Sequence, residues 1–309
     1  MIVWALFSFI AFLPCRLHAQ KCRYNDIWKR GDEIGHFEYP ERGCKILALG
    51  GTPLGDSGVH QLLSSLSLSY VEELHLASVG LTTAGVGSLG KALMMIKNSK
   101  LRVLNIYGNE IGDSGAAALA ALFPGSSLSR SLKTLGLGVN NITKSGASAL
   151  GFALGRCSTC TLRILGLYRN NLANQGAKAL AKFVVAPDIL QLERLYLGGN
   201  DIGDEGAIHL SNSLMTNTNL EVLSLEGGSI GDLGAMALAK ALQESKSFKA
   251  LDIRSCLPTR RNCGHSSMSM ESVVTNSKGA LTRQGIEALR LAVAVRSGEL
   301  KVTGDVSFV

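Results

Sequence analysis

Two stretches of the chain carry the residue types of a serine hydrolase. Gly-Asp-Ser-Gly occurs at 55–58 and again at 112–115, and His60 lies three residues after Ser57. A nucleophilic serine requires a base within hydrogen-bonding reach and a third group that orients this base. In stretches of otherwise similar sequence, the serine position holds Ala84, Glu205, Leu233 or Gln284. We therefore interpret Gly-Asp-Ser-Gly as structural, and we expect no catalytic residue and no enzymatic activity.

Two further motifs resemble cofactor or metal sites. The stretch 85–90 matches G-x-G-x-x-G, but the equivalent stretch 115–120 reads Gly-Ala-Ala-Ala-Leu-Ala, which indicates a glycine-rich start of a helix. Cys157-Ser158-Thr159-Cys160 lacks both the thioredoxin-like surroundings of a redox motif and a second cysteine pair nearby for zinc. We expect no cofactor and no metal, and we interpret Cys157 and Cys160 as a local disulfide.

The cysteine content favours disulfides more generally. Six cysteines remain when Cys15 is assigned to a leader, and an even number suits a secreted chain. Neighbours in sequence are the natural partners, which gives the pairs Cys22–Cys44, Cys157–Cys160 and Cys256–Cys263. The alternative is a cytosolic protein with six free thiols, several of them buried as small apolar groups.

Residues 1–19 resemble a secretory signal peptide. The apolar run 2–13 is too short to span a bilayer, and Leu17-His18-Ala19 ends in the small residue expected before a cleavage site. The run has no Lys or Arg before it, so an unused apolar leader is the alternative. We expect a secreted or extracellular protein without a transmembrane span, with a cytoplasmic location as the alternative. In a secreted chain Asn141-Ile142-Thr143 is a candidate glycosylation site at Asn141.

The positions of these motifs are set by an internal repeat. The pattern L-x-x-L-x-L-x-x-N-x-I-G-D-x-G-A-x-A-L begins most clearly at Leu101 and recurs with a spacing of about 28–31 residues. The leucines of its first half have strand spacing, and the apolar residues after Gly-Asp have helical spacing. Gly or Thr precedes the Asp position in most units and suits an N-cap, while Asp113, Asp204 and Asp232 suit the positive end of the helix dipole. Eight units begin at Cys44, Val71, Leu101, Leu132, Leu162, Leu192, Leu220 and Phe248.

One strand and one helix cannot bury an apolar face alone, but stacked units can. The predicted fold is an α/β solenoid with a parallel sheet on its concave side and helices on its convex side. A glycine at a fixed place in the helical half indicates a close approach of helix and strand; its copies are Gly85, Gly115, Gly146, Gly176, Gly206, Gly234 and Gly285. Four asparagines at one place in successive units are expected to bond the backbone of neighbouring turns: Asn109, Asn140, Asn170 and Asn200.

This unit resembles the ribonuclease-inhibitor-like class of leucine-rich repeats. The resemblance covers residues 44–298 and implies a horseshoe whose concave face is usually the binding surface. Gly228 and Cys256 depart from the Asn position, and Cys is an accepted substitute there, which puts the Cys256–Cys263 pair in doubt. Residues 20–43 are expected to cap the first unit, an inserted loop occupies about 256–279, and 299–309 form a tail.

The concave surface is the predicted binding site. Tyr and Arg are enriched in interface hot spots, and Tyr107, Tyr168 and Tyr196 are expected to form one aromatic patch. The alternative is that these tyrosines reflect strand propensity alone. The predicted partner-binding residues flank the strand leucines and are Asn105, Tyr107, Tyr168, Arg169, Arg194, Tyr196, Glu226, Asp252 and Arg254.

These observations favour a protein-binding module with a protein partner. The formal net charge of +7 mildly favours acidic partners, but Lys and Arg are dispersed, so we expect neither nucleic acid nor a small-molecule substrate. The family resemblance implies two alternatives in the cytosol: an immune-receptor-like sensor fragment and a Ran-type GTPase-activating protein. A nuclease inhibitor is disfavoured because such inhibitors face basic enzymes.

Overall fold

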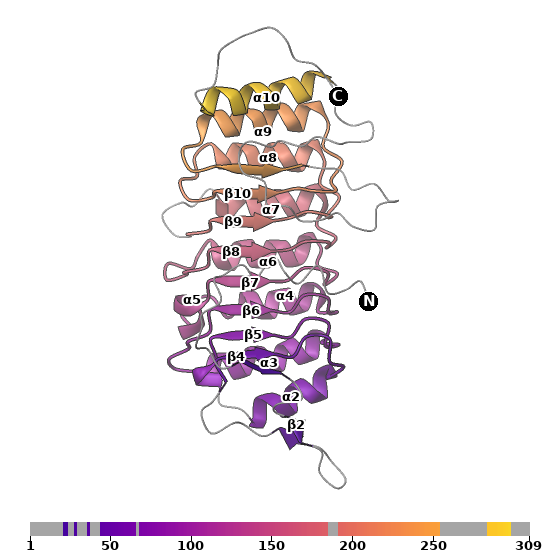
Figure 1. Cartoon of the computed structure of the whole chain (residues 1–309), viewed down its shortest axis with the longest axis vertical. Coiled ribbons are helices and arrows are strands. Elements are labelled where there is room, and N and C mark those ends of the chain that lie inside the picture. The colour runs from indigo at the N-terminus through magenta and orange to yellow at the C-terminus, as the bar shows by residue number, and fades with distance from the viewer. Residues whose placement is uncertain are drawn as a thin grey trace.

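The computed structural model of the chain is a single open stack of strand–helix units (Figure 1). The structure describes residues 21–23, 28–29, 36–37, 44–65, 68–184, 191–253 and 283–297. The predicted signal peptide, the inserted loop and the tail lie outside these residues. So do Arg254, Cys256 and Cys263.

The sheet contains nine parallel strands, and each strand pairs with its neighbours in sequence order. In that order they are β1 (Lys21–Arg23), β4 (Ile46–Ala48), β5 (Glu73–His75), β6 (Val103–Asn105), β7 (Thr134–Gly136), β8 (Ile164–Gly166), β9 (Arg194–Tyr196), β10 (Val222–Ser224) and β11 (Ala250–Asp252). The strands β2 (Trp28–Lys29) and β3 (His36–Phe37) form a separate antiparallel pair.

A helix follows each strand from β4 onward, and the helices form a layer behind the sheet in Figure 1. These helices are α2 (Gly55–Ser65), α3 (Thr83–Met95), α4 (Gly112–Ala120), α6 (Lys144–Leu154), α7 (Ala173–Val184), α8 (Asp204–Leu214), α9 (Asp232–Glu244) and α10 (Arg283–Ser297). The eight predicted units are therefore confirmed as one α/β solenoid. Within the described residues, no helix has the length and apolar character needed to cross a membrane.

The strand leucines place the core between the sheet and the helices. The central leucine of each strand is in register with that of the next, as in Leu74↔Leu104 and Leu104↔Leu135. The three side chains are buried. Because one apolar side chain per strand repeats at the same height, each unit buries its core only against its neighbours.

The segment before the first unit contributes the outermost strand. Lys21 pairs with Ile46 and Cys22 with Leu47, so β1 extends the sheet by one parallel strand. A disulfide joins Cys22 to Cys44, whose Cα atoms are 5.8 Å apart. This bond closes β1 onto the turn that precedes β4.

The helix of the third unit is shorter than the apolar spacing suggested. The helical spacing of the apolar residues after Gly-Asp predicts that Leu122 lies on the helix, but α4 ends at Ala120 and Leu122 lies buried in the following turn. Pro124 and Gly125 follow, and both disfavour a continued helix. A short extra helix, α5 (Ser127–Ser131), then leads into β7.

The aspartates of Gly-Asp-Ser-Gly connect successive helices. Asp113 Oδ1 accepts the backbone N–H groups of Thr143 (2.7 Å) and Gly146 (2.9 Å), both in the next unit. Asp56 binds Thr82 in the same way, and Asp204 binds Gly231 and Gly234. These carboxylates therefore cap the helix of the following unit, in addition to lying in the first turn of their own.

In this capping relay a side chain of one unit caps the helix of the next, and it determines how each helix begins. Where the preceding unit supplies Asp or Asn, the residue before the helix is extended and is the expected N-cap: Thr82, Thr143, Gly203 and Gly231. Where it supplies Thr83 or Lys144, the next helix begins on a residue with positive φ, at Gly112 and Ala173. The sequence predicts Gly112 as the N-cap of α4, but the N-cap in the structure is Ile111.

The fixed helical glycine makes room for the same carboxylate. A Cβ at Gly146 would lie 2.7 Å from Asp113 Oδ1 and 2.7 Å from Ile142 Cγ2, and one at Gly234 would lie 2.6 Å from Asp204 Oδ1. The sequence predicts that this glycine marks a close approach of helix and strand. In the structure the glycine lies close to the capping side chain and to its own helix's first turn.

Candidate protein-binding surface

The edge where the strands end, the carboxyl edge, is built on the asparagine ladder. Asn170 Oδ1 accepts the N–H groups of Asn140 and Ile142 in the preceding unit, both at 3.0 Å. Its Nδ2 donates to the carbonyls of Leu137 and Leu167, both at 2.9 Å. Asn109 and Asn200 make the equivalent bonds, and all of these amides are buried. The ladder fixes the turns that follow the strands.

Asn140 departs from this pattern. Its Nδ2 donates to the carbonyls of Ile106 and Gly138, but its buried Oδ1 accepts no hydrogen bond. The backbone it would bind belongs to the turn before α4, the helix that begins on the positive-φ residue Gly112. The N–H of Gly112 donates to the backbone carbonyl of Asn140, as the N–H of Ala173 does to that of Asn200, whose Oδ1 keeps both of its hydrogen bonds.

Two tyrosines lie on glycines of the neighbouring unit. A Cβ at Gly138 would lie 2.9 Å from Tyr107 Cδ2, and a Cβ at Gly198 would lie 3.0 Å from Tyr168 Cδ2. Both tyrosines are half-buried. Each ring therefore lies close to the turn of the next unit, where a glycine leaves room for it.

Arg169 extends this aromatic surface. Its guanidinium lies 5.4 Å from the centre of the Tyr168 ring, and its side chain is exposed. Arg169 has φ +50°, a conformation that favours glycine, and Gly108 and Gly199 occupy the equivalent position in other units. Burial raises the pKa of Tyr168, the nearby Glu226 raises it further and Arg169 opposes the rise. The Tyr168 hydroxyl therefore stays protonated at neutral pH.

The other predicted binding residues are distributed unevenly. Arg194 is exposed and Tyr196 half-buried at the two ends of β9, and Asp252 is half-buried on β11. Tyr196 is in register with Gly166, but a Cβ at Gly166 would meet only backbone atoms within 4 Å. Tyr196 therefore does not lie across its neighbouring glycine, as Tyr107 and Tyr168 do.

Asn105 and Glu226 do not offer the accessible side chains that the sequence suggested. Asn105 is 4% exposed because its Oδ1 turns back to accept the N–H of Tyr107 (3.1 Å). Glu226 is 3% exposed beside Tyr168. Strand alternation correctly pointed both residues away from the leucine core, but it carried no information on what covers them.

The edge where the strands begin, the amino edge, carries a row of charges that the sequence reading missed. Each unit has a charged residue directly after its first core position: Lys45, Glu72, Arg102, Lys133, Arg163, Glu193, Glu221 and Lys249. Their backbones are hydrogen-bonded from unit to unit, as from Lys133 N–H to Arg102 O at 2.8 Å. The signal was present, since all eight copies are charged at one place.

Most members of this charge row have an opposite charge beside them. Glu72 pairs with Lys45 (3.1 Å) and with Arg102 (3.5 Å). Glu193 pairs with Arg163, and Glu221 with Lys249. Among these eight residues only Lys133 has a like charge on both sides. Burial, Arg163 and Arg102 lower the pKa of Lys133, and Glu193 opposes the change.

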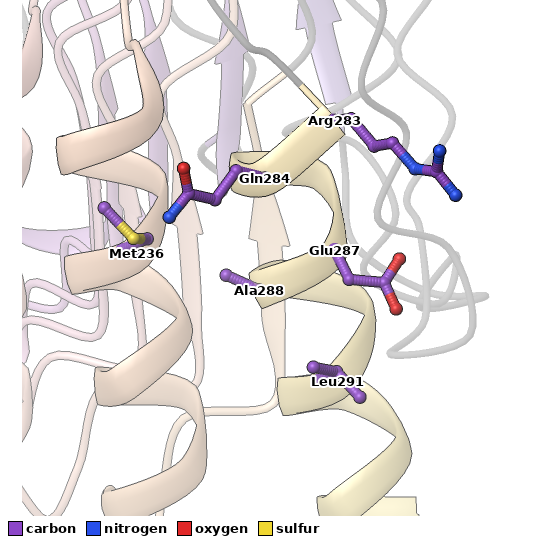
Figure 2. Close-up of a pocket in the computed structure, with 6 residues that line it drawn as sticks. All are labelled: Met236, Arg283, Gln284, Glu287, Ala288 and Leu291. Carbon is purple, nitrogen blue, oxygen red and sulfur yellow. The ribbon is translucent and has the colours of Figure 1, made fainter. Parts of the chain in front are cut away.

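A hollow lies on the helical side. A groove of about 620 Å³ runs between α9 and α10 and is lined by Met236, Arg283, Gln284, Glu287, Ala288 and Leu291. Figure 2 shows Arg283 and Glu287 directed away from Met236, so the charged groups do not converge on it. Elsewhere, a disulfide joins Cys157 to Cys160, and Ser57 and His60 are both exposed on α2. No group of three or more potential metal-ligating side chains occurs in the described part of the chain.

A comparison with protein families agrees with this architecture. A family model described as "Leucine Rich repeat" matches residues 97–120, 128–151, 192–211 and 216–239. The fold is a leucine-rich-repeat solenoid. Among solved structures this solenoid is similar to "Leiomodin-1 Actin-Binding Site 2 (ABS2)", with 17% identity and a TM-score of 0.38 over 54% of this chain and 82% of that chain. No curated protein sequence matches it.

Proposed function

We propose that this leucine-rich-repeat solenoid binds a protein partner through the sheet face, which is the concave side of such solenoids. The observation that carries the proposal is the pair Tyr107 and Tyr168, each seated on a glycine of the next unit, with exposed Arg169 on the second ring. Tyr and Arg are enriched in interface hot spots, and Tyr buries a large area at low entropic cost.

The strained backbone supports the same assignment. Holding a non-glycine residue at positive φ costs free energy, and such residues cluster at binding sites. Arg169 is in that conformation, as are Ser78 and Val139 at the equivalent place, whereas Gly108 and Gly199 occupy it in other units. Of the three non-glycine residues Arg169 has the charged side chain, which lies beside the Tyr168 ring, and a role in contacting a partner accounts for it.

We further propose that the repeats are of the ribonuclease-inhibitor-like subtype and that the protein is secreted. Units of about 28–31 residues, each with a complete α-helix, support the subtype. The apolar leader and the two cysteine pairs support secretion. Mass spectrometry of the protein from its native host, with and without reduction, tests this. A chain that begins at Gln20 with bridged cysteines is expected. An intact Met1 with free thiols would favour a cytosolic regulator.

Site-specific photocrosslinking tests the binding face. Benzoylphenylalanine is placed at Tyr168 in one sample and at Phe152 in another. Phe152 is 68% exposed on α6, on the helical side, and serves as the matched control. We expect the probe at Tyr168 to capture a defined protein and the probe at Phe152 to capture none.

The affinity for the captured protein then tests the aromatic surface. Replacing Tyr107 and Tyr168 together by Ala is expected to weaken binding at least tenfold, since each hot-spot truncation costs about 2 kcal/mol or more. Phe152→Ala is expected to leave the affinity unchanged, and circular dichroism checks that both variants are folded. An unchanged affinity in the double variant, or equal capture from Phe152, would contradict the proposal.

A further inference from the structure

The charge row at the amino edge contains a run of three positive charges in successive units. Lys133 lies between Arg102 and Arg163, whose side chains are 49% and 47% exposed. Direct backbone hydrogen bonds from Lys133 N–H to Arg102 O and from Arg163 N–H to Lys133 O hold the three residues in adjacent units. Like charges held side by side repel each other, and an acidic residue at 133 would pair with both arginines. This repulsion therefore destabilises the protein when no partner is bound.

We propose that Arg102, Lys133 and Arg163 bind one or two carboxylate side chains of an acidic polypeptide segment in the partner. This inference rests on the proposed function of the sheet face and specifies the chemistry of its partner. Arg binds carboxylates through two parallel hydrogen bonds, and Lys binds them as a compact charge. A carboxylate placed over Lys133 would remove the repulsion that the free protein carries.

The ends of the cationic cluster limit the size of the ligand. Glu72 and Glu193 flank it on the two sides, and each is already paired with the nearer arginine. Adjacent strands are about 4.8 Å apart, so the three cations extend over about 10 Å. A long polyanion, such as a nucleic acid or a sulfated polysaccharide, would have to continue over Glu72 or Glu193. A short acidic peptide segment avoids this repulsion.

The cluster and the tyrosines lie at opposite ends of the same strands. Arg102 and Tyr107 flank β6, and Arg163 and Tyr168 flank β8. Five residues of extended chain correspond to about 16 Å. A partner that contacts both edges of the sheet at β6–β8 therefore places an acidic segment at the amino edge and an apolar or aromatic surface at the carboxyl edge.

A titration with a model acidic peptide tests the cluster directly. Fluorescein-labelled deca-glutamate is titrated into the full chain at low salt, and binding is followed by fluorescence anisotropy. Lys133→Glu is compared with Lys91→Glu, which changes net charge equally at an exposed position on α3. We expect Lys133→Glu to weaken binding at least tenfold and Lys91→Glu to weaken it less than twofold. Equal affinities for the two variants would overturn the proposal.

Two further measurements separate the possible failures. Heparin-derived oligosaccharide and inorganic phosphate are titrated alongside deca-glutamate. Binding of either that depends on Lys133, without binding of deca-glutamate, would overturn an acidic polypeptide as the ligand. The affinity of Lys133→Glu for the protein captured from Tyr168 is then measured. An unchanged affinity would overturn the cluster proposal and leave the proposed function intact, while a tenfold loss would support both. The peptide titration does not require the captured partner, so it stands if the crosslinking fails.

Discussion

The two edges of the sheet both carry polar side chains that connect one unit to the next, but they differ in burial and in regularity. At the carboxyl edge, buried amides such as Asn109 and Asn170 repeat the same hydrogen bonds in successive units. At the amino edge, the sign of the charge varies from unit to unit, and only Lys133 among the eight residues has a like charge on both sides. The first ladder stabilises the turns, whereas the second leaves one cation without a counter-charge.

The difference shows how a repeat protein separates stability from recognition. A buried polar group that is left unpaired costs about 1–3 kcal/mol, which favours the same pairing in successive units, with Asn140 Oδ1 as an exception. An exposed ion pair contributes about 0–1 kcal/mol, so its position can change from unit to unit without loss of the fold. Irregularity is therefore tolerated at the amino edge, and it is where a partner can be selected.

The largest expected effect comes from truncating the carboxyl-edge ladder. Asn170→Ala removes the partner that Asn170 supplies to the Asn140 and Ile142 N–H groups and to the Leu137 carbonyl, while the Leu167 carbonyl keeps its bond from Asn200 Nδ2. At the cost per buried group given above, we expect the free energy of unfolding to fall by about 3–5 kcal/mol. Urea denaturation followed by circular dichroism measures it.

Asn140→Ala is the matched comparison for Asn170→Ala. Its Oδ1 accepts no hydrogen bond, and the carbonyls of Ile106 and Gly138 keep their bonds from Asn109 Nδ2 and the Gly108 N–H, so the substitution removes two hydrogen bonds without orphaning a backbone group. We expect a loss of about 2 kcal/mol, smaller than for Asn170. Equal losses for the two variants would show that the bonds to Oδ1 contribute little, and the two edges would then differ less than we infer.

The capping relay is expected to give an intermediate effect. Asp113→Ala removes the N–H acceptor at the start of α6 and the bond from the Thr143 hydroxyl, so we expect a loss of about 1–2 kcal/mol in thermal or urea unfolding. Asp113→Asn is the control, because Asn174 caps α8 with an amide. A full loss in Asp113→Asn would show that the charge itself is required.

The same residue predicts a pH dependence. Burial raises the pKa of Asp113, but hydrogen bonds from Thr143 and Gly146 outweigh it and lower the pKa below its ordinary value of 3.8. The stability it contributes is therefore present above about pH 3.8 and is lost as the pH falls through the lower folded value. Unfolding curves from pH 5 to pH 2 should fall more steeply for the parent protein than for Asp113→Asn. Parallel curves would contradict this assignment.

The smallest expected effect has the opposite sign. Lys133→Glu replaces two repulsions with pairs to Arg102 and Arg163, so we expect the melting temperature to rise, with a gain of up to about 1 kcal/mol. The gain should shrink at high salt because the pairs are exposed. A lower stability at low salt would mean that Lys133 has a structural role in the free protein.

Most of the fold followed from the sequence because a repeat restates its constraints in every unit. The spacing of the leucines in units such as 101–106 determined the strands, and the change to helical spacing after Gly-Asp determined the helices. The candidate site was only partly predictable. Tyr107, Tyr168 and Arg169 followed from strand alternation, whereas the burial of Asn105 and Glu226 depends on neighbours that alternation does not specify.

The sequence by itself determined the architecture: a parallel sheet of stacked units, one helix per unit, and a row of buried asparagines. Only the tertiary structure decided which side chains meet across units. Asp113 caps the helix thirty residues later, Gly198 seats the Tyr168 ring, and Lys133 stands between two arginines. The physical reason is that periodicity fixes the face of each residue, whereas contacts between units depend on the register and on which residue occupies the neighbouring position.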